Sequence, residues 1–318
     1  MKSFNNRNTQ IFYQTIIVSL VFIFNTCSMK KEVKPLSFQD FPNLKLGFST
    51  QNFLGCMLVN VENLREIIKY AYKEGYSFIE LRDPEAKLSL IECKEIADFA
   101  DSLSIEIIYE ININLLASNF LSVFRKALEN TALLNDKGIL RTTISNSEFA
   151  ADKNKKGWNE QELNQIVELA ENCGKLAQEH NLKFIVENAS GAFFGKDSSY
   201  FGFADFFRRT MNVGLQFDTA NPFQNNSREK SNPVEIEKFL TTITDRWLTT
   251  HLKSGKDGVF QPILDDNPLE FKKVLSLMSA NNIVYVAFEL NSVSDKETCF
   301  ENHSKSIDYL IRKGLMVR

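Results

Sequence analysis

The sequence is poor in residues that several kinds of site require. Its 318 residues include only 3 histidines and 13 glycines, and no two of its 5 cysteines have Cys-x-x-Cys spacing. The cysteine spacing argues against a zinc knuckle or a dithiol redox motif. Lysine and arginine total 37 against 40 aspartates and glutamates, so there is no basic excess to indicate a nucleic-acid partner. We also find no glycine-rich loop of the kind that cradles a phosphate group.

The remaining composition is that of a globular protein with a bulky core. Apolar residues make up 43% of the chain and charged residues 24%, and the net charge is −3. This length suits one large α/β domain or two smaller ones. The 27 phenylalanines predict a core of large side chains.

The second half of the sequence contains four short apolar stretches, each with a metal-type ligand near its end. They cover residues 183–188, 213–221, 247–253 and 283–291, and their β-branched and aromatic content predicts buried strands. The ligands are Glu187, Asp218, His251 and Glu289. Their spacings of 31, 33 and 38 residues (187 to 218, 218 to 251, 251 to 289) each fit one strand plus one helix. This set of oxygen and nitrogen ligands suits one divalent cation, Mn, Mg, Co or Zn.

The whole chain after residue 44 repeats the same strand-and-helix unit. Strands are predicted at 45–50, 77–83, 105–112, 139–144, 183–188, 213–218, 247–253 and 283–291. Helices are predicted at 61–74, 89–103, 119–135, 160–180 and 297–313, and helix-like sequence follows the other strands as well. Consecutive parallel strands need a crossover connection, usually a helix, that brings the chain back to the same end of the sheet. The pattern over about 270 residues therefore predicts a single (β/α)8 TIM barrel at 44–318, with the four ligands at its mouth.

The N-terminus has the pattern of an export signal. Lys2 and Arg7 precede an apolar run at 16–24, which is too short for a comfortable transmembrane helix and fits the apolar region of a signal peptide. A cysteine, Cys27, follows almost directly. The pattern resembles a bacterial lipoprotein lipobox, with Phe24 in place of the usual leucine and Thr26 in place of the usual glycine, alanine or serine.

This resemblance implies lipidation at Cys27 and an exported, periplasm-facing lipoprotein of the cell envelope. Residues 1–27 would be the signal, and 28–43, rich in lysine and proline, would be a tether. The membrane would be reached only through the lipid anchor. A plain secretory signal and an uncleaved cytosolic N-terminus remain as alternatives.

The other cysteines and histidines have simpler interpretations. An exported protein can form disulfides, but we expect Cys56, Cys93, Cys173 and Cys299 to be separate buried thiols. His180 is predicted in a helix-to-strand turn and His303 on the last helix, both in contact with solvent. That leaves His251 as the histidine placed for a site.

The strand ends together resemble a known superfamily. Val186-Glu187-Asn188, Phe217-Asp218-Thr219-Ala220-Asn221, His251-Leu252-Lys253 and Phe288-Glu289 follow one another in this order. They resemble the xylose isomerase-like barrels, which include sugar phosphate isomerases and epimerases, inosose dehydratases and the endonuclease IV group. The resemblance covers residues 45–314 and implies a metal site used on carbohydrates. An endonuclease IV-like site is disfavoured, because this chain has too few histidines for it.

Three positions depart from the ketose 3-epimerases of that superfamily. Asn221 stands where they usually have histidine, and Ser254 where aspartate often follows the His-Leu-Lys. A second acid shortly after the first glutamate is also missing, because Asn188 is followed by alanine, serine and glycine. The resemblance therefore implies the metal ligands but not a particular substrate.

The resemblance, together with the ligand set, implies an isomerase or epimerase that abstracts a proton next to a carbonyl through an enediolate. Glu187 and Glu289 are the predicted acid–base pair, and Lys253, two residues past His251, points to the same face by strand alternation. The predicted substrate is a free sugar, keto-sugar or cyclitol, because export argues against a phosphorylated one. A dehydratase or lyase using the same site for β-elimination remains an alternative, as does a non-catalytic envelope barrel that binds carbohydrate.

Substrate contacts are predicted from the other strand ends. The candidates are Glu80, Asn112, Arg141 and Asn221. Salt bridges between neighbouring strand ends explain Glu80, Arg82, Glu110 and Arg141 equally well. The aromatic loop at 193–203 is predicted to pack, with a sugar-stacking wall as the alternative. Assembly into a homo-oligomer is left open.

Overall fold

A computed structural model of the chain describes residues 33–113, 115–135, 138–144, 157–189, 192–194, 199–223, 232–256 and 259–317. The predicted export signal, Cys27 and the first part of the tether lie outside these residues. The chain divides into two units, residues 1–34 and residues 35–318, each of which makes most of its contacts within itself. Among the residues that are described, no helix is both long and apolar enough to cross a membrane.

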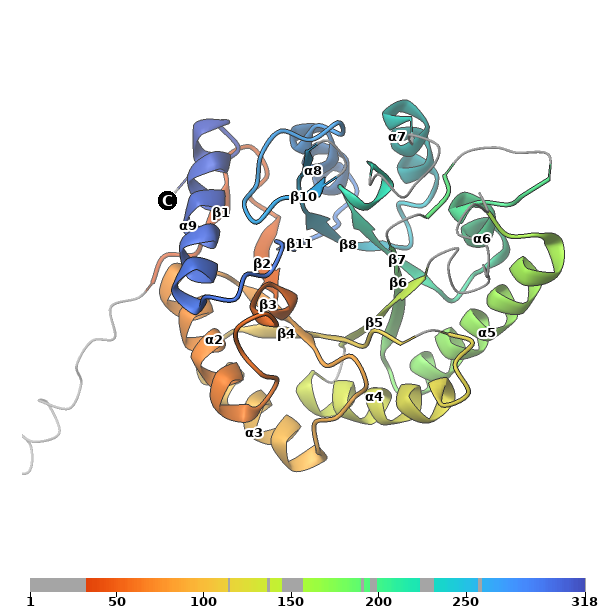
Figure 1. The fold of residues 1–318 in the computed structure, drawn as a ribbon, viewed down its shortest axis with the longest axis horizontal. Helices are drawn as coiled ribbons and strands as arrows, with labels where there is room; N and C mark the ends of the chain where they lie inside the picture. Colours follow the sequence, from red (N-terminus) through yellow and green to blue (C-terminus); the bar gives the residue numbers. More distant parts are fainter. Residues whose placement is uncertain are drawn as a thin grey trace, which may run out of the picture. The chain divides into compact units, whose positions relative to one another are not determined.

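Residues 35–318 contain a closed barrel of parallel strands, as the alternation of strands and helices predicts (Figure 1). The strands are β2 (Lys45–Ser49), β3 (Phe78–Arg82), β4 (Glu106–Glu110), β5 (Ile139–Ile144), β6 (Lys183–Asn188), β7 (Gly214–Asp218), β8 (Trp247–Leu252) and β11 (Tyr285–Phe288). They pair in chain order, and β11 pairs with β2 to close the ring. The (β/α)8 fold is confirmed.

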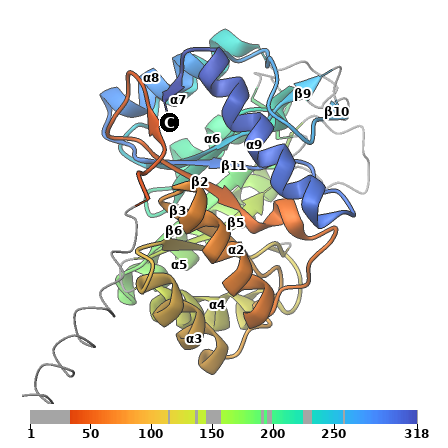
Figure 2. The ribbon, with the colours of Figure 1, turned by 90° about the vertical axis from the view of Figure 1, so that its left-hand side faces the viewer.

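Helices surround the barrel on its outside (Figure 1). They are α2 (Val61–Glu74), α3 (Leu90–Asp101), α4 (Phe120–Leu134), α5 (Glu160–Glu179), α6 (Phe203–Arg209), α7 (Pro233–Thr242), α8 (Phe271–Ala280) and α9 (Lys296–Arg312). Figure 2 shows α9 beside α2, where the Tyr70 and Phe300 rings lie 4.4 Å apart. This contact joins the last helix to the first and completes the helical layer.

Short elements fill the connections between the main strands and helices. The 3-10 turns η1 (Thr50–Phe53) and η3 (Asn221–Phe223) follow β2 and β7. A small hairpin of β9 (Gly255–Lys256) and β10 (Val259–Phe260) follows β8. Two terminal strands, β1 (Ser37–Phe38) and β12 (Met316–Val317), pair antiparallel. These turns and the hairpin extend the carboxyl ends of the barrel strands.

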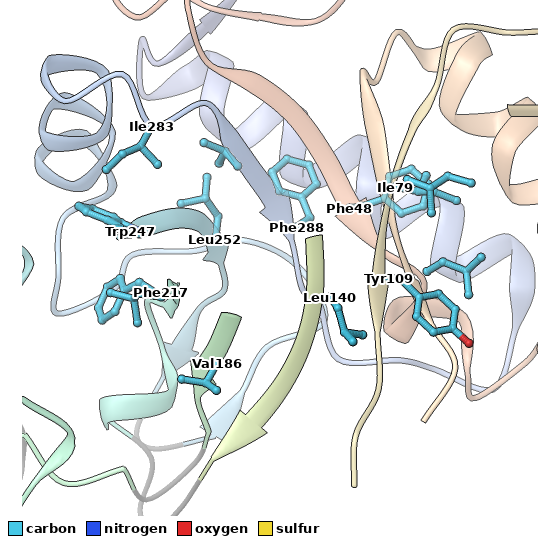
Figure 3. Close-up of a cluster of buried hydrophobic side chains, with 14 of the residues drawn as sticks. Phe48, Ile79, Tyr109, Leu140, Val186, Phe217, Trp247, Leu252, Ile283 and Phe288 are labelled. Carbon is cyan, nitrogen blue, oxygen red and sulfur yellow. The ribbon is translucent and has the colours of Figure 1, made fainter. Parts of the chain in front are cut away.

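The main core lies between the strands and the helices. Alternate residues of each strand face outward, and Figure 3 shows many of them in one cluster. The labelled members are Phe48, Ile79, Tyr109, Leu140, Val186, Phe217, Trp247, Leu252, Ile283 and Phe288. The predicted bulky core is confirmed, and the phenylalanines supply much of it.

The barrel interior changes from apolar to charged along the strands. A small cluster of Phe78, Ile108, Ile139, Ile185 and Ala287 fills the interior toward the amino ends of the strands. Two positions further along each of these strands come the charged residues Glu80, Glu110, Arg141, Glu187 and Glu289. Side chains on one face of a strand recur every second residue. The charged residues therefore form a layer above the apolar plug, toward the mouth.

His303 is buried, so the prediction that it is in contact with solvent is wrong. Its Nε2 lies 3.0 Å from the Asn52 side-chain nitrogen, and its Nδ1 lies 3.3 Å from the Tyr76 hydroxyl. Burial among aromatic rings lowers the pKa of His303 to about 3, so the ring is neutral at pH 7. The helical spacing from Cys299 to His303 to Ile307 places it on the inner face of α9. His180, in contrast, is exposed as predicted.

The aromatic loop after β6 packs against the helices where it is described. Phe193, Phe194 and Phe203 are buried. The Phe194 ring lies 5.3 Å from that of Phe203 and 5.7 Å from that of Phe239. For these residues the packing interpretation holds rather than a sugar-stacking wall.

Candidate functional site

The four predicted ligands converge at the carboxyl ends of four consecutive strands. Glu187 lies near the end of β6, Asp218 ends β7, His251 lies in β8, and Glu289 follows β11 directly. All four are at least 96% buried, since Glu289 is the most exposed at 4%. One ligand atom from each lies within 4.8 Å of the others. The sequence prediction that these residues share one point is therefore matched by the fold.

His251 lies at the centre of the cluster, with carboxylates on both ring nitrogens. Its Nδ1 is 2.8 Å from Glu187, 3.4 Å from Glu289 and 3.8 Å from Asp218. Its Nε2 is 2.5 Å from Glu80 and 3.8 Å from Glu110. Burial disfavours the charged ring, but Glu80 and Glu289 outweigh it and raise the pKa of His251 well above the usual value.

One carboxylate oxygen of Asp218 is buried without a hydrogen-bond partner. Its Oδ1 accepts hydrogen bonds from the backbone N–H groups of Ala220 at 2.8 Å and Asn221 at 2.7 Å. Its Oδ2 is buried and has no hydrogen-bond partner, although the Lys253 ammonium lies 3.6 Å away. Buried carboxylate oxygens are normally hydrogen-bonded or bound to a metal. This oxygen lies 3.8 Å from His251 Nδ1, within the group of four side chains that could hold a cation.

Three permanent cations are buried among these carboxylates. Arg82 contacts Glu289 at 3.2 Å, and Lys253 contacts it on the other oxygen at 2.7 Å. Arg141 contacts Glu187 at 2.7 Å and Glu110 at 3.5 Å. The predicted orientation of Lys253 toward the cluster is seen in the structure. The salt-bridge interpretation of the early strand ends also describes Arg82 and Arg141.

The charge of the cluster matches a divalent cation. Five carboxylates (Glu80, Glu110, Glu187, Asp218 and Glu289) against the cations Arg82, Arg141 and Lys253 leave a formal charge of −2 when His251 is neutral. Burial raises the pKa of Glu110 to about 8 despite the opposing Arg141 charge. In the protein alone, protons on Glu110 and His251 therefore balance the excess negative charge. A divalent cation would replace them.

The two glutamates at the mouth are held ionised. Burial opposes the charge on Glu289, but Lys253 and His251 hold its pKa well below the usual range. Burial likewise opposes the charge on Glu187, and Arg141 lowers its pKa. Burial also opposes the charge on Lys253, yet Glu289 and Asp218 raise its pKa to about 12. At pH 7 these groups are therefore two carboxylates and an ammonium.

A cavity of about 280 Å³ opens above the cluster. It is lined by Gln51, Arg82, Asn112, Thr143, Glu187, Ala189, Asn221, Lys253, Phe260, Glu289, Leu290 and Asn291. A larger hollow of about 660 Å³ lies between α7 and α8, and no member of the cluster lines it. Because the ionisable groups face the smaller cavity, that cavity is the candidate site.

The predicted substrate contacts divide into two groups. Asn112 and Asn221 line the cavity, and the Asn221 side-chain oxygen is buried without a hydrogen-bond partner. Glu80 and Arg141 are fully buried below the cavity and are not part of its lining. Glu80 contacts His251 and Arg141 contacts Glu187, so these two residues would position candidate metal ligands rather than touch a substrate.

Sequence reasoning missed several residues of the site. Gln216 lies under the cluster, accepting a hydrogen bond from Arg141 and donating one to Glu80 at 2.8 Å. Strand alternation would have found it, because it is two residues before Asp218. Gln51, Phe260 and Asn291 line the cavity from connecting segments. Segments outside regular strands give no such periodic signal.

Asn221 and Ser254, which depart from the epimerase pattern, have structural roles, as does their neighbour Asn188. The Asn188 side chain accepts from the Asp218 N–H at 2.8 Å and donates to its carbonyl at 3.1 Å. Asn221 donates to the Asn188 carbonyl at 2.8 Å. Ser254 exchanges two 2.7 Å hydrogen bonds with the Asp265 backbone. These residues fix the loops that present Asp218 and Lys253.

The chain matches no family model and no curated protein. Its fold is similar to solved structures at low identity. A D-allulose 3-epimerase from Methylomonas sp., solved with D-allulose, has a TM-score of 0.62 at 13% identity over 88% of this chain and 99% of that one. A sugar phosphate isomerase/epimerase from Parabacteroides distasonis has a TM-score of 0.58 at 16% identity over 84% of this chain and 93% of that one.

A xylose isomerase-like TIM barrel protein from Mycobacterium smegmatis, solved in complex with magnesium, is also similar. Its TM-score is 0.57 at 15% identity, over 85% of this chain and 97% of that one. At these identities the likeness concerns the fold. The fold that this chain shares with them is the (β/α)8 barrel.

Proposed function

We propose that this protein is a divalent-metal-dependent sugar isomerase or epimerase that abstracts a proton next to a carbonyl through an enediolate. The observation that supports this most is the convergence of Glu187, Asp218, His251 and Glu289 within 4.8 Å at the mouth of the barrel. The similarity to sugar epimerase folds agrees with the proposal.

The residues present fit a divalent cation. They supply three carboxylates and one imidazole nitrogen, a free buried oxygen on Asp218, and an uncompensated charge of −2. A cation bound there supplies electrophilic polarisation of a carbonyl oxygen. In this proposal Asp218 and His251 only hold the cation, because neither lines the cavity.

Glu187 and Glu289 are the proposed proton carriers. Both line the cavity as well as belonging to the ligand set, so each can reach a substrate carbon or hydroxyl. Lys253 donates to Glu289 at 2.7 Å and lies over the Phe260 ring at 3.9 Å. Its ammonium group is thus fixed at the cavity wall, where it can stabilise negative charge on a substrate oxygen.

The cavity lining favours a neutral polyhydroxy substrate. Gln51, Asn112, Thr143, Asn221 and Asn291 supply amide and hydroxyl groups. Both cations in the described lining, Arg82 and Lys253, are already paired with Glu289. A phosphorylated substrate would need a further cation, so a free sugar, keto-sugar or cyclitol fits best. Elimination by a dehydratase or lyase would use the same residues and differs only in the group that leaves.

Deuterium incorporation from solvent tests the proposed chemistry. The metal-loaded protein is incubated with a panel of free keto-sugars in deuterated water, and exchange is followed by NMR. We expect deuterium next to the carbonyl, and a loss of about 10²- to 10⁴-fold in rate for Glu289→Gln, because removing a proton carrier costs that much.

Glu106→Gln is the matched control. Glu106 lies at the amino end of β4, away from the mouth, where it pairs with Lys45 and accepts from the Tyr285 hydroxyl at 2.7 Å. The same chemical change there should leave the exchange rate unaltered. Release of water or an aglycone without exchange would instead support elimination. Sugar binding without either reaction would support the non-catalytic barrel.

Glu80 is a proposed positioning residue for His251. A cation among Glu187, Asp218 and Glu289 would need the lone pair of His251 Nδ1, so the proton must be on Nε2. One carboxylate oxygen of Glu80 lies 2.5 Å from His251 Nε2 and would accept its hydrogen bond. The other oxygen accepts a hydrogen bond from the Gln216 side chain at 2.8 Å. Carboxylates in this position fix the tautomer and orientation of a metal-ligating histidine.

We expect Glu80→Gln to weaken divalent metal binding by about 10- to 100-fold. The amide oxygen would stay with Gln216, and the amide N–H would then face Nε2 and favour the wrong tautomer. Glu106→Gln is again the control, because Glu106 lies outside the cluster at the amino end of β4, where it pairs with Lys45. Competition titration against a fluorescent chelator measures both affinities. Equal affinities for the two variants would contradict the role of Glu80.

We further propose that the protein is exported and anchored through a lipid on Cys27. The support is the charged and apolar pattern of residues 1–27. Metabolic labelling with palmitate in a bacterial host should label the full chain and not Cys27→Ser. Labelling that persists in the variant, or none in the original chain, would contradict the anchor.

A further inference from the structure

Two connecting segments meet at the mouth on the seam where the barrel closes. One follows β2 and contains η1, and the other follows β11 and leads into α9. The Asn52 side chain joins them, donating to the Phe288 carbonyl at 3.1 Å and accepting from the Leu290 N–H at 2.8 Å. These hydrogen bonds fix the first segment against the last strand.

The two segments are also in close backbone contact. A Cβ atom on Gly55 would lie 2.6 Å from the Val293 carbonyl oxygen, closer than side chains tolerate. The Phe53 and Phe300 rings lie 5.1 Å apart beside this contact. The segments therefore have little freedom to separate while the barrel is folded.

Two cysteines face each other across this contact. The Sγ atoms of Cys56 and Cys299 are 3.5 Å apart, although the residues are 243 positions apart in the chain. Cys56 is partly buried and Cys299 is buried. All four are free thiols in the structure, but Cys56 and Cys299 are in contact with each other, whereas Cys93 and Cys173 are each buried separately in the core.

We propose that Cys56 and Cys299 form a disulfide that fastens the barrel seam at the mouth. The two sulfurs must approach from 3.5 Å to about 2 Å, a shift that side-chain rotation and small loop movements can supply. Both thiols lose a proton and together lose two electrons. A disulfide-donating oxidant, such as oxidised glutathione or a thiol–disulfide oxidoreductase, accepts them and becomes two thiols.

The disulfide would join the first and last units of the barrel. Gln51 belongs to the first segment, and Glu289, Leu290 and Asn291 to the second, and all of them line the candidate cavity. Closing so long a loop removes more freedom from the unfolded chain than closing a short one. Oxidation would therefore stabilise the fold and hold two sides of the cavity together. This inference does not depend on the proposed function.

The state of the thiols indicates when oxidation takes place. Burial, together with Cys299, raises the pKa of Cys56 to about 12, so little thiolate exists in the folded protein. Exchange needs thiolate. We therefore expect the bond to form efficiently while the chain folds and slowly once it has folded.

The test uses the full chain in a Cys27→Ser background, which leaves the four cysteines of the described domain. The protein is refolded with either oxidised glutathione or reductant, denatured and alkylated, and its mass and non-reduced peptides are analysed. We expect four alkylated thiols after reduction and two after oxidation, with one peptide linking Cys56 to Cys299. We expect the oxidised form to melt roughly 5–10 °C higher.

Cys56→Ser and Cys299→Ser should each abolish this difference between oxidised and reduced protein, whereas Cys173→Ala should retain it. The comparison of the two redox forms of the unsubstituted pair remains informative if a variant fails to fold. Four alkylated thiols after oxidation, or a linked peptide from another pair, would overturn the proposal. Unchanged melting despite the expected linked peptide would overturn its stabilising role.

Discussion

The buried carboxylates inside the barrel depend on compensating charge, and the arrangement of the mouth follows from that need. Five carboxylates lie in one interior, where leaving even one unpaired costs several kcal/mol. Arg141 is fully buried and contacts both Glu110 and Glu187, and Arg82 and Lys253 hold Glu289 from two sides. The apolar plug below separates this layer from the other end of the barrel.

Compensation by these cations is incomplete, and that is what makes the cluster a candidate metal site rather than a salt-bridge network. A network that only stabilised the fold would give every buried carboxylate oxygen a hydrogen bond. Here Asp218 Oδ2 and Glu110 Oε1 are buried without hydrogen-bond partners. Protons on His251 and Glu110 fill the remaining deficit in the protein alone. The same deficit provides the attraction for a divalent cation.

The sequence was sufficient to predict the fold and the convergence of the four candidate ligands, because both depend on local patterns. Glu187, Asp218, His251 and Glu289 each stand near the end of an apolar stretch, and the spacing of one repeat unit places such ends together. The orientation of Lys253 followed from strand alternation in the same way.

Other parts of the site depend on contacts that local patterns do not encode. Glu80 contacts His251 across 171 positions, and Cys56 contacts Cys299 across 243. A charged residue at a strand end can face substrate or another strand, and only the closed barrel distinguishes Arg141, below the cavity, from Asn112, which lines it. The prediction for His303 was wrong because it used only the residue's place in the last helix and did not ask which face of that helix it occupies.

Asn221 and Ser254, two positions that differ from ketose 3-epimerases, have structural roles that they share with Asn188. Asn188 and Asn221 fasten the β7 connection, and Ser254 fastens the segment after Lys253. Their side chains keep the ligand set in place without an added acid or histidine. In the proposed enzyme, selectivity for a substrate would then come largely from the amide groups that line the cavity, among them Asn112 and Asn291.

The most direct test of this account is calorimetric titration of metal-free protein with Mn²⁺ in two buffers of different ionisation enthalpy. Because its neighbours raise the pKa of His251 well above the usual value, the ring holds a proton that a cation must displace. The account predicts one ion per chain, release of about one to two protons, and tighter binding at pH 8 than at pH 6.5. Absence of binding, or binding without proton release and independent of pH, would contradict it.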